Sequence, residues 1–249
     1  MLMRLLRIAA LLPAIMPGIP GLQAAGLESF TATYEVSRGA LTIGSARISL
    51  TREAGGGYHY ESHSWPASLT GLFNKNKLHE TSSGHFYGRE IRPDTYHYLR
   101  TGSDSERVAH LTFDWDTGTV VNNVAGSRWK MAVPADTHDK LSTQLGMMQA
   151  LADGDTDFTF NVADGGTLKQ YRYQVTGREI LDVPAGTFRT VRVKKLGGNN
   201  TRRTQVWCAP ELGYKPVRIR RLEKDGTEYT SELESASGAL FEPVKVRAD

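Results

Sequence analysis

Hydrophobic and polar residues alternate with a period of two along most of the chain. The apolar residues Phe30, Ala32, Tyr34 and Val36 alternate with polar ones, the pattern of a β-strand with one buried face. Similar segments separated by glycine-containing turns follow as far as Glu234. About fourteen strands are predicted in this way, so the fold is mainly β.

One segment, residues 136–152, has a helical repeat instead. Leu141, Leu145 and Met148 follow one another at spacings of three or four residues and form one apolar stripe. Asp136 or Thr137 is expected to cap the helix through its side-chain oxygen.

A sheet of so many strands is expected to curl, because strand twist accumulates. The predicted fold is therefore a strongly curved antiparallel sheet, or an incomplete or closed β-barrel. One amphipathic α-helix, at about residues 136–152, packs on its concave side.

The first 24 residues resemble a secretory signal peptide. Arg4 and Arg7 precede an apolar run, and small residues follow at the expected cleavage site after Ala24 or Ala25. No later apolar run reaches the roughly 20 residues needed to cross a bilayer. We therefore expect residues 25–249 to form one β-rich domain that is exported to the periplasm as a soluble protein.

Charge is distributed unevenly along the chain. Loss of Arg4 and Arg7 with the signal peptide lowers the formal charge from +3 to +1, which argues against nucleic acid as a partner. Basic residues nevertheless dominate residues 189–224. Arg218 and Arg220 alternate with apolar neighbours there and share one strand face, where they could hold phosphate or carboxylate oxygens. The alternative is a solvated outer face balanced by acidic neighbours.

Residues 67–76 lack alternation but carry three large apolar side chains. Leu69, Leu72 and Phe73 lie close together in this segment. We expect a loop that forms a lid or rim over an apolar concavity.

Two patterns could in principle bind a metal. His59, Glu61 and His63 would project from one strand face, which suits zinc, but a polar outer face explains them as well. The aspartates at positions 153, 155 and 157 resemble half of a calcium loop, although a solvated turn is the simpler reading. No metal, and no other cofactor, is expected.

Catalytic motifs are absent from the sequence. It contains no G-x-S-x-G, no H-E-x-x-H and no phosphate-binding loop, and Cys208 is better read as a small buried residue. No catalytic residue is therefore assigned, and an enzyme is not expected.

Five segments together resemble one family of exported bacterial proteins. They are TYEVSRGALTIG, FDWDTGTV, DKLSTQL, DVPAGTF and WCAPELGYKPVRI, in this order. Their order and spacing between Phe30 and Glu234 are similar to the family called domain of unknown function 3108. This resemblance implies a Gram-negative envelope protein without assigned catalytic residues. A looser similarity of fold links the chain to periplasmic carriers of the lipoprotein-localisation type, in which an open half-barrel holds acyl chains.

These observations favour a non-enzymatic periplasmic binding or carrier protein. Its ligand would be an amphipathic envelope molecule such as a lipid, an acyl chain or a lipidated glycan. The expected ligand-binding residues are Leu69, Leu72, Phe73, Leu141, Leu145, Met148, Arg218 and Arg220. A structural or scaffold protein that binds another envelope protein or a glycan is the alternative, and a hydrolase is the second alternative. The space beneath the helix should separate these readings.

Overall fold

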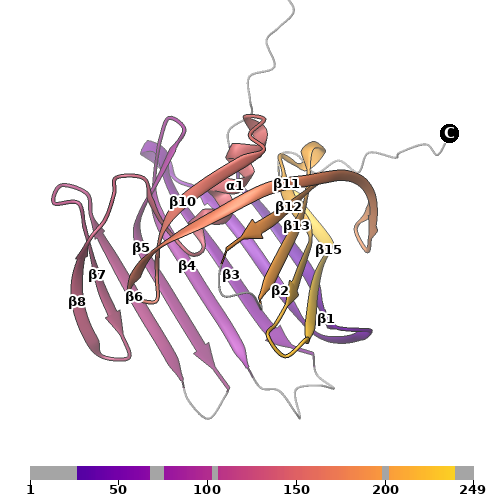
Figure 1. Ribbon diagram of the computed structural model, residues 1–249, viewed down its shortest axis with the longest axis horizontal. Helices are drawn as coiled ribbons and strands as arrows, with labels where there is room; N and C mark the ends of the chain where they lie inside the picture. The colour runs from indigo at the N-terminus through magenta and orange to yellow at the C-terminus, as the bar shows by residue number, and fades with distance from the viewer. Residues whose placement is uncertain (1–26, 68–75, 103–105, 198–201, 239–249) are drawn as a thin grey trace, which may run out of the picture.

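The computed structural model describes residues 27–67, 76–102, 106–197 and 202–238 (Figure 1). The predicted signal peptide lies outside the described residues, as do Leu69, Leu72 and Phe73 of the predicted lid. Those two expectations therefore stay predictions.

The first half of the chain forms an antiparallel meander in which each strand pairs with the next. A short 3-10 helix, η1 (Ala54–Gly56), connects its second and third strands. The strands are β1 (Phe30–Arg38), β2 (Leu41–Arg52), β3 (Gly57–Pro66), β4 (Lys77–Tyr87), β5 (Glu90–Thr101), β6 (Arg107–Asp114), β7 (Thr119–Val124) and β8 (Ser127–Ala132).

The second half forms a similar meander that returns to the beginning of the first. Its last strand pairs with β1, and η2 (Pro210–Leu212) precedes β14. The strands are β10 (Asp157–Asp164), β11 (Thr167–Val183), β12 (Gly186–Leu196), β13 (Arg203–Ala209), β14 (Lys215–Leu222) and β15 (Glu228–Gly238).

Between the two meanders lie β9 (Thr137–Asp139) and the helix α1 (Ser142–Ala152). β9 pairs with β10 in parallel, because α1 crosses over between them. The described residues thus form one mixed 15-stranded sheet that is antiparallel except at this pair.

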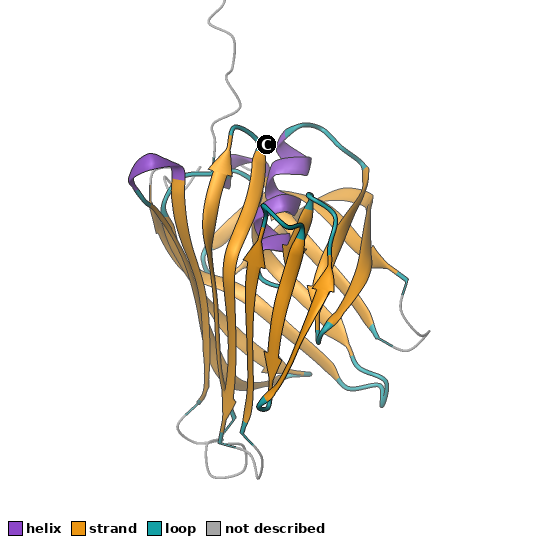
Figure 2. Ribbon diagram, turned by 90° about the vertical axis from the view of Figure 1, so that its left-hand side faces the viewer, coloured by secondary structure: helices purple, strands orange, loops and turns teal. Residues whose placement is uncertain are grey.

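The sheet curls strongly, but its two end strands do not pair with each other. In strand order it begins at β8 and ends at β9, although these two strands follow one another in the chain. The indole Nε1 of Trp129 on β8 donates to the carbonyl oxygen of Gly166, in the β10–β11 turn, at 3.1 Å. Figures 1 and 2 show the rolled sheet and α1 inside one end of it. The prediction of a mainly β, strongly curved sheet with one helix is confirmed.

A β-bulge lies at Gly44. The register of β1 and β2 shifts between Val36 and Ser37, opposite this glycine. A side chain at Gly44 would approach the carbonyl oxygen of Trp65 to 2.3 Å, so the close strand contact requires glycine.

The predicted start of the helix is wrong by about two turns. The chain is extended at residues 137–139, and α1 begins only at Ser142. Neither Asp136 nor Thr137 caps it. Instead, Oδ1 of Asp139 accepts hydrogen bonds from the backbone N–H groups of Leu141 and Ser142, at 2.7 and 2.8 Å. This carboxylate satisfies donors that the first turn leaves free.

The helix is also less amphipathic than predicted, because two hydrophobic clusters enclose it. Leu141, Leu145 and Met148 pack in the larger cluster, which includes Tyr34 and Tyr60 of the first meander. The opposite side of α1 packs in a second cluster, formed by Met147, Ala150, Leu151, Phe158, Tyr173, Val191, Val193, Val206 and Cys208. The helix therefore fills one end of the rolled sheet instead of lying on one face.

Candidate functional site

The helix residues predicted to bind a ligand are closely packed. Leu141, Leu145 and Met148 are 2%, 0% and 1% exposed. They do not line the pocket discussed below. Their role in binding stays a prediction, and the geometry shows a plug at this position.

β14 lies between β13 and β15, and its residue Val217 faces the core. Because side chains alternate along a strand, Arg218 and Arg220 project outward. Each arginine is ion-paired with a glutamate of β15. Arg218 contacts Glu232 at 2.5 Å, and Arg220 contacts Glu228 at 2.5 Å. This is the alternative considered from the sequence, a polar outer face with acidic neighbours. Their role in holding a headgroup stays a prediction, and the proposal below does not use them.

A pocket of about 460 Å³ lies where the two meanders approach without pairing. Tyr96 and Tyr98 on β5 and Leu111 on β6 form one wall. Lys140, just before α1, and Asp164, at the end of β10, form the other. The pocket therefore opens beside the start of the helix and not beneath it.

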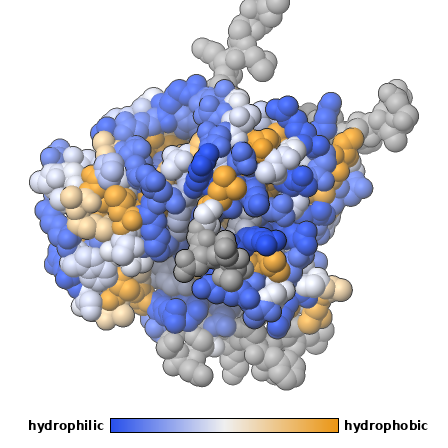
Figure 3. Space-filling model, viewed as in Figure 1, coloured by the Kyte–Doolittle hydropathy of each residue, from blue (hydrophilic) through white to orange (hydrophobic). Residues whose placement is uncertain are grey.

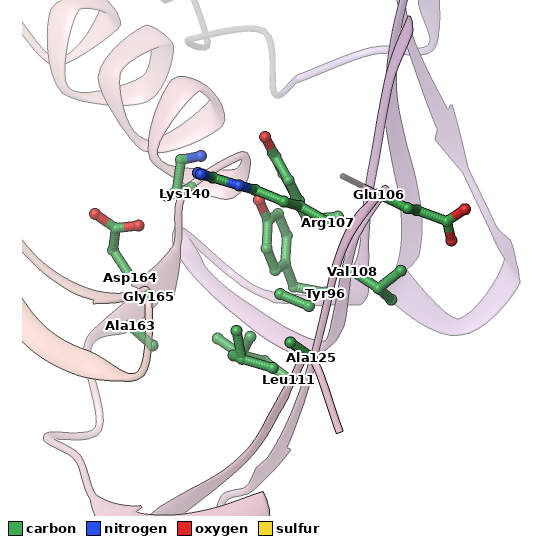
Figure 4. Close-up of a pocket in the computed structure, with 13 residues that line it drawn as sticks. Tyr96, Glu106, Arg107, Val108, Leu111, Ala125, Lys140, Ala163, Asp164 and Gly165 are labelled. Atoms are coloured by element: carbon green, nitrogen blue, oxygen red, sulfur yellow. The ribbon is translucent and has the colours of Figure 1, made fainter. Parts of the chain in front are cut away.

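Two cations face each other on one side of this pocket. Figure 4 shows the side chains of Lys140 and Arg107 pointing toward one another, whereas Glu106 points away. The Nζ of Lys140 lies 3.5 Å from Oε1 of Glu80 and 5.0 Å from the centre of the Tyr98 ring. The site thus offers two positive groups, of which Lys140 is only loosely paired.

Tyr96 holds the carboxylate that partners Lys140. Its hydroxyl donates to Oε1 of Glu80 at 2.5 Å. Burial raises the pKa of Tyr96, and the negative charge of Glu80 raises it further, so the hydroxyl stays protonated. Tyr96 therefore fixes Glu80 as an acceptor beside Lys140.

The other side of the pocket is apolar. Leu111 and Ala163 are 2% and 0% exposed, and Val124 and Ala125 complete this surface. Figure 4 shows Leu111, Ala125 and Ala163 together, away from the two cations. The pocket is thus amphipathic, with charge on one side and hydrocarbon on the other.

Asp164 is already neutralised by its own neighbours. Its Oδ2 accepts hydrogen bonds from Lys169 Nζ at 2.8 Å and from the Tyr171 hydroxyl at 2.7 Å. Burial acts to raise the pKa of Asp164, but these hydrogen bonds outweigh it and lower the pKa. Lys195 lies over the Tyr171 ring, and burial lowers its pKa to about 8. The acidic group in the pocket wall is therefore held by Lys169 and Tyr171, on the β10–β11 side of the pocket.

A buried amide next to the apolar side lacks partners. Asn122 on β7 is 0% exposed and pairs in register with Leu111 and Trp129. Among the described residues, neither its Oδ1 nor its Nδ2 has a hydrogen-bond partner. Buried polar groups are normally satisfied, so this amide points to a water or a polar ligand atom near the pocket.

Asp139 forms a buried polar link between the sheet and the helix start. Its Oδ2 accepts a hydrogen bond from the Ser82 hydroxyl at 2.6 Å, and Ser82 also contacts the Tyr58 hydroxyl at 3.1 Å. The backbone N–H of Asp139 donates to Oγ of Ser142 at 3.0 Å. Burial raises the pKa of Asp139 to about 6, although the hydrogen bonds from Ser82, Ser142 and Leu141 act to lower it.

The metal patterns considered from the sequence are not assembled. Among the described residues, no group of three or more His, Cys, Asp or Glu side chains is arranged to hold a metal ion. Instead, Oε1 of Glu61 lies 2.6 Å from Nε2 of His79. Asp157 forms an ion pair with Arg172 at 3.0 Å. The zinc and calcium readings therefore gain no geometric support.

Groups that could act in hydrolysis are not combined into a triad. Ser83 Oγ lies 2.8 Å from Nδ1 of His59, but among the described residues no carboxylate bonds to that imidazole. Ser82 and Ser142 contact Asp139 and are 0% exposed. Burial raises the pKa of the Cys208 thiol, which is 0% exposed and keeps its proton.

The fold and the pocket define a class, an incompletely closed β-barrel with a helix plugging one end. The family described as "Protein of unknown function (DUF3108)" matches residues 30–234, and the chain belongs to this family. The resemblance found in the five sequence segments is thereby confirmed. No curated protein matches the chain.

Solved structures support the fold. A beta-barrel-like protein of domain of unknown function DUF1849 from Brucella abortus matches with a TM-score of 0.58 and 9% identity. The match covers 86% of this chain and 99% of that one. This likeness supports the fold alone.

Two further structures match less well. A protein from Parabacteroides distasonis described as a candidate lipoprotein has a TM-score of 0.35 and 11% identity, over 85% of this chain and 96% of that one. A protein from Bacteroides fragilis, described as a candidate exported protein with a YmcC-like fold, has a TM-score of 0.32 and 11% identity. That match covers 85% of this chain and 97% of the other. Within the part of the chain that the structure describes, no helix has the length and hydropathy to span a bilayer.

The pocket could hardly be predicted from the residue pattern. In the sequence, Lys140 is only one residue of the segment DKLSTQL, and Tyr96, Tyr98 and Arg107 occupy ordinary strand positions. Tyr96 and Tyr98 do alternate with His97, which shows that both tyrosines share one face. What could not be seen is that β10 ends opposite this face.

Proposed function

We propose that the protein is a non-enzymatic periplasmic binding or carrier protein for an amphipathic anion of the cell envelope. The observation that carries this proposal is the pocket in which Lys140 and Arg107 face each other across from an apolar surface. A phosphate or carboxylate headgroup would bind the two cations. An acyl chain would lie against Leu111 and Ala163.

The dimensions of the pocket suit such a ligand. Its volume of about 460 Å³ lies within the range of roughly 300–1,000 Å³ for small-molecule sites. Charge-assisted hydrogen bonds to phosphate or carboxylate are about twice as strong as neutral ones. The headgroup would therefore determine selectivity, and the hydrocarbon would add affinity through burial.

One face of the protein has the polar surface expected of a protein in water. On the face shown in Figure 3 the surface is mainly hydrophilic, and apolar side chains gather only in small separate groups. The signal-peptide pattern in residues 1–24 supports export. Envelope ligands would be available in the periplasm.

The experiment is native mass spectrometry on protein expressed with its own N-terminal segment and purified without detergent or tag. We expect an adduct that denaturation releases and solvent extraction recovers. Ligand-free protein is then titrated with palmitate and with a palmitoyl lysophospholipid carrying a phosphate. Hexadecylamine, which has the opposite charge, is the matched control. Equal binding of the amine and the acid, or no binding of either, would contradict the proposal.

A scaffold function is the second candidate, and the packing of the helix favours it. Leu145 and Met148 are buried in the larger hydrophobic cluster, and such close packing of the helix is the arrangement expected of a scaffold. This reading predicts a ligand-free protein that binds another envelope component. Cross-linking in intact cells, followed by mass spectrometry, tests for such a partner.

A further inference from the structure

The outward face of β3–β6 carries most of the imidazole groups of the protein. This face lies on the other side of the sheet from the pocket, because the neighbouring Tyr58, Tyr60, Tyr96 and Leu111 are buried inside. Six of the seven histidines of the chain lie on it: His59, His63, His79, His85, His97 and His110.

Two of these histidines are in direct contact. His97 on β5 and His110 on β6 are paired in register, with ring centres 3.9 Å apart. Their Nδ1 atoms lie 3.1 Å apart. Two imidazole nitrogens that bind one zinc ion at 2.0–2.1 Å each are about 2.9–3.4 Å apart, depending on the angle at the metal. The spacing of the pair already matches a chelate.

A second contact orients one of the rings. Oγ1 of Thr112 lies 3.1 Å from Nε2 of His110. When Nε2 donates its proton to this hydroxyl, the Nδ1 lone pair of His110 faces His97. Metal-binding histidines are usually held in this way through their other ring nitrogen.

The surroundings of His97 favour the neutral form of its ring, which is the form that binds metals. Burial lowers the pKa of His97, and the neighbouring His110 and His79 lower it further. His97 can move its proton to Nε2 when a metal takes its Nδ1 lone pair, so the metal replaces the hydrogen bond between the rings.

We propose that His97 and His110 chelate a divalent transition-metal ion that prefers imidazole, such as Zn²⁺ or Cu²⁺. The described residues hold no group of three or more metal-binding side chains around one point. Water therefore completes the coordination on the open face, and the ion is exchangeable. The site is independent of the pocket and of the proposed function.

Isothermal titration calorimetry of metal-free, tag-free protein with Zn²⁺ and with Cu²⁺ tests this proposal, and Mg²⁺ serves as the negative control. We expect one ion per chain, with affinity at least tenfold lower in His97→Gln and in His110→Gln. His85→Gln is the matched control on the same face, because its ring is held by Asp94 at 2.8 Å. Thermal unfolding confirms that each variant is folded.

Thr112→Val tests the positioning contact. It should weaken binding by about tenfold without changing the stoichiometry, since partners of ligating histidines typically contribute this much. No binding of either ion would overturn the proposal, as would binding that survives both histidine substitutions. Binding that is lost in His79→Gln but kept in His97→Gln would also overturn it, because the ion would then belong to the Glu61–His79 pair.

Discussion

Ser82 on β4 donates a hydrogen bond of 2.6 Å to the carboxylate of Asp139, and this contact joins the sheet to the start of α1. The carboxylate also accepts the N–H groups of Leu141 and Ser142. Lys140 lies between these anchored residues and reaches the pocket wall. The buried link therefore positions a cation of the proposed binding site.

The first prediction concerns the pH dependence of stability. Burial raises the pKa of Asp139 from 3.8 to about 6, so the folded protein binds this proton more tightly than the unfolded chain does. The resulting stabilisation is complete below pH 3.8 and is lost as the pH rises through 6. In Asp139→Asn this contribution, about 3 kcal/mol in size, should be absent. Chemical denaturation at a series of pH values, from below 3.8 to neutral, measures this pH-dependent part of the unfolding free energy.

Asparagine is the suitable substitution because its side-chain oxygen can still accept from Leu141 and Ser142. Its amide can donate to Ser82, so the link persists without the charge. Parallel pH profiles for the wild type and Asp139→Asn would contradict the assignment. Asp139→Ala should be destabilised at every pH, because buried donors lose their acceptor.

Strand pattern and fold class could be predicted from the sequence because alternation depends on each strand separately. The start of the helix could not, because the chain at Thr137–Asp139 is made extended by pairing with β10, a contact distant in sequence. Local propensity and tertiary pairing compete at such a boundary, and pairing prevails here.

The site was less predictable than the fold for a related reason. The sequence pattern places Arg218 and Arg220 on one strand face and so suggests a ligand-binding role, but alternation alone does not say which face is inside. Their glutamate partners on β15 become neighbours only through the sheet register. Lys140 and Arg107 meet only because the ends of the sheet approach each other.

The second prediction concerns the seam between β8 and the β10–β11 turn. Gly166 has a φ of 78°, and an added Cβ would lie 1.8 Å from the Trp129 ring. Gly166→Ala should therefore be destabilised by more than the roughly 1 kcal/mol expected of a positive φ alone. Thermal or chemical unfolding measures the difference.

Gly226 supplies the matched control. Its φ is 81°, and among the described residues no atom lies within 4 Å of a Cβ added there. Gly226→Ala thus reports the backbone cost without the clash. If both glycine variants lose the same stability, the contact with Trp129 does not constrain the seam. The double variant Gly166→Ala, Trp129→Ala should recover the excess.

The third prediction concerns the helix as a plug. Leu145 is 0% exposed inside the larger cluster, so Leu145→Ala should cost about 2–5 kcal/mol of unfolding free energy. Leu168 is 41% exposed, and Leu168→Ala should change stability by no more than about 0.5 kcal/mol. A small effect at Leu145, comparable with that at Leu168, would mean that the helix is a loosely held lid.

The fourth prediction separates the pocket cations from the outward arginines. Lys140→Met removes one charge from the pocket and should weaken binding of palmitate or of the palmitoyl lysophospholipid by about tenfold, since hydrogen bonds to charged groups contribute about 1.5–3 kcal/mol. Arg220→Met removes a charge that is paired with Glu228 on the outer face and should leave the affinity unchanged. Fluorescence competition measures both.

Loss of folding stability should not account for a difference in affinity between Lys140→Met and Arg220→Met. Lys140 is only loosely paired, at 3.5 Å, and surface pairs such as Arg220–Glu228 typically contribute about 0–1 kcal/mol. Lys194 is exposed on β12, so Lys194→Met serves as a control for loss of positive charge in general. If Arg220→Met weakens binding and Lys140→Met does not, the ligand binds the outer face, as the strand pattern alone had suggested. Equal losses in all three variants would mean that the ligand responds to total charge, and no pocket would be needed to explain its binding.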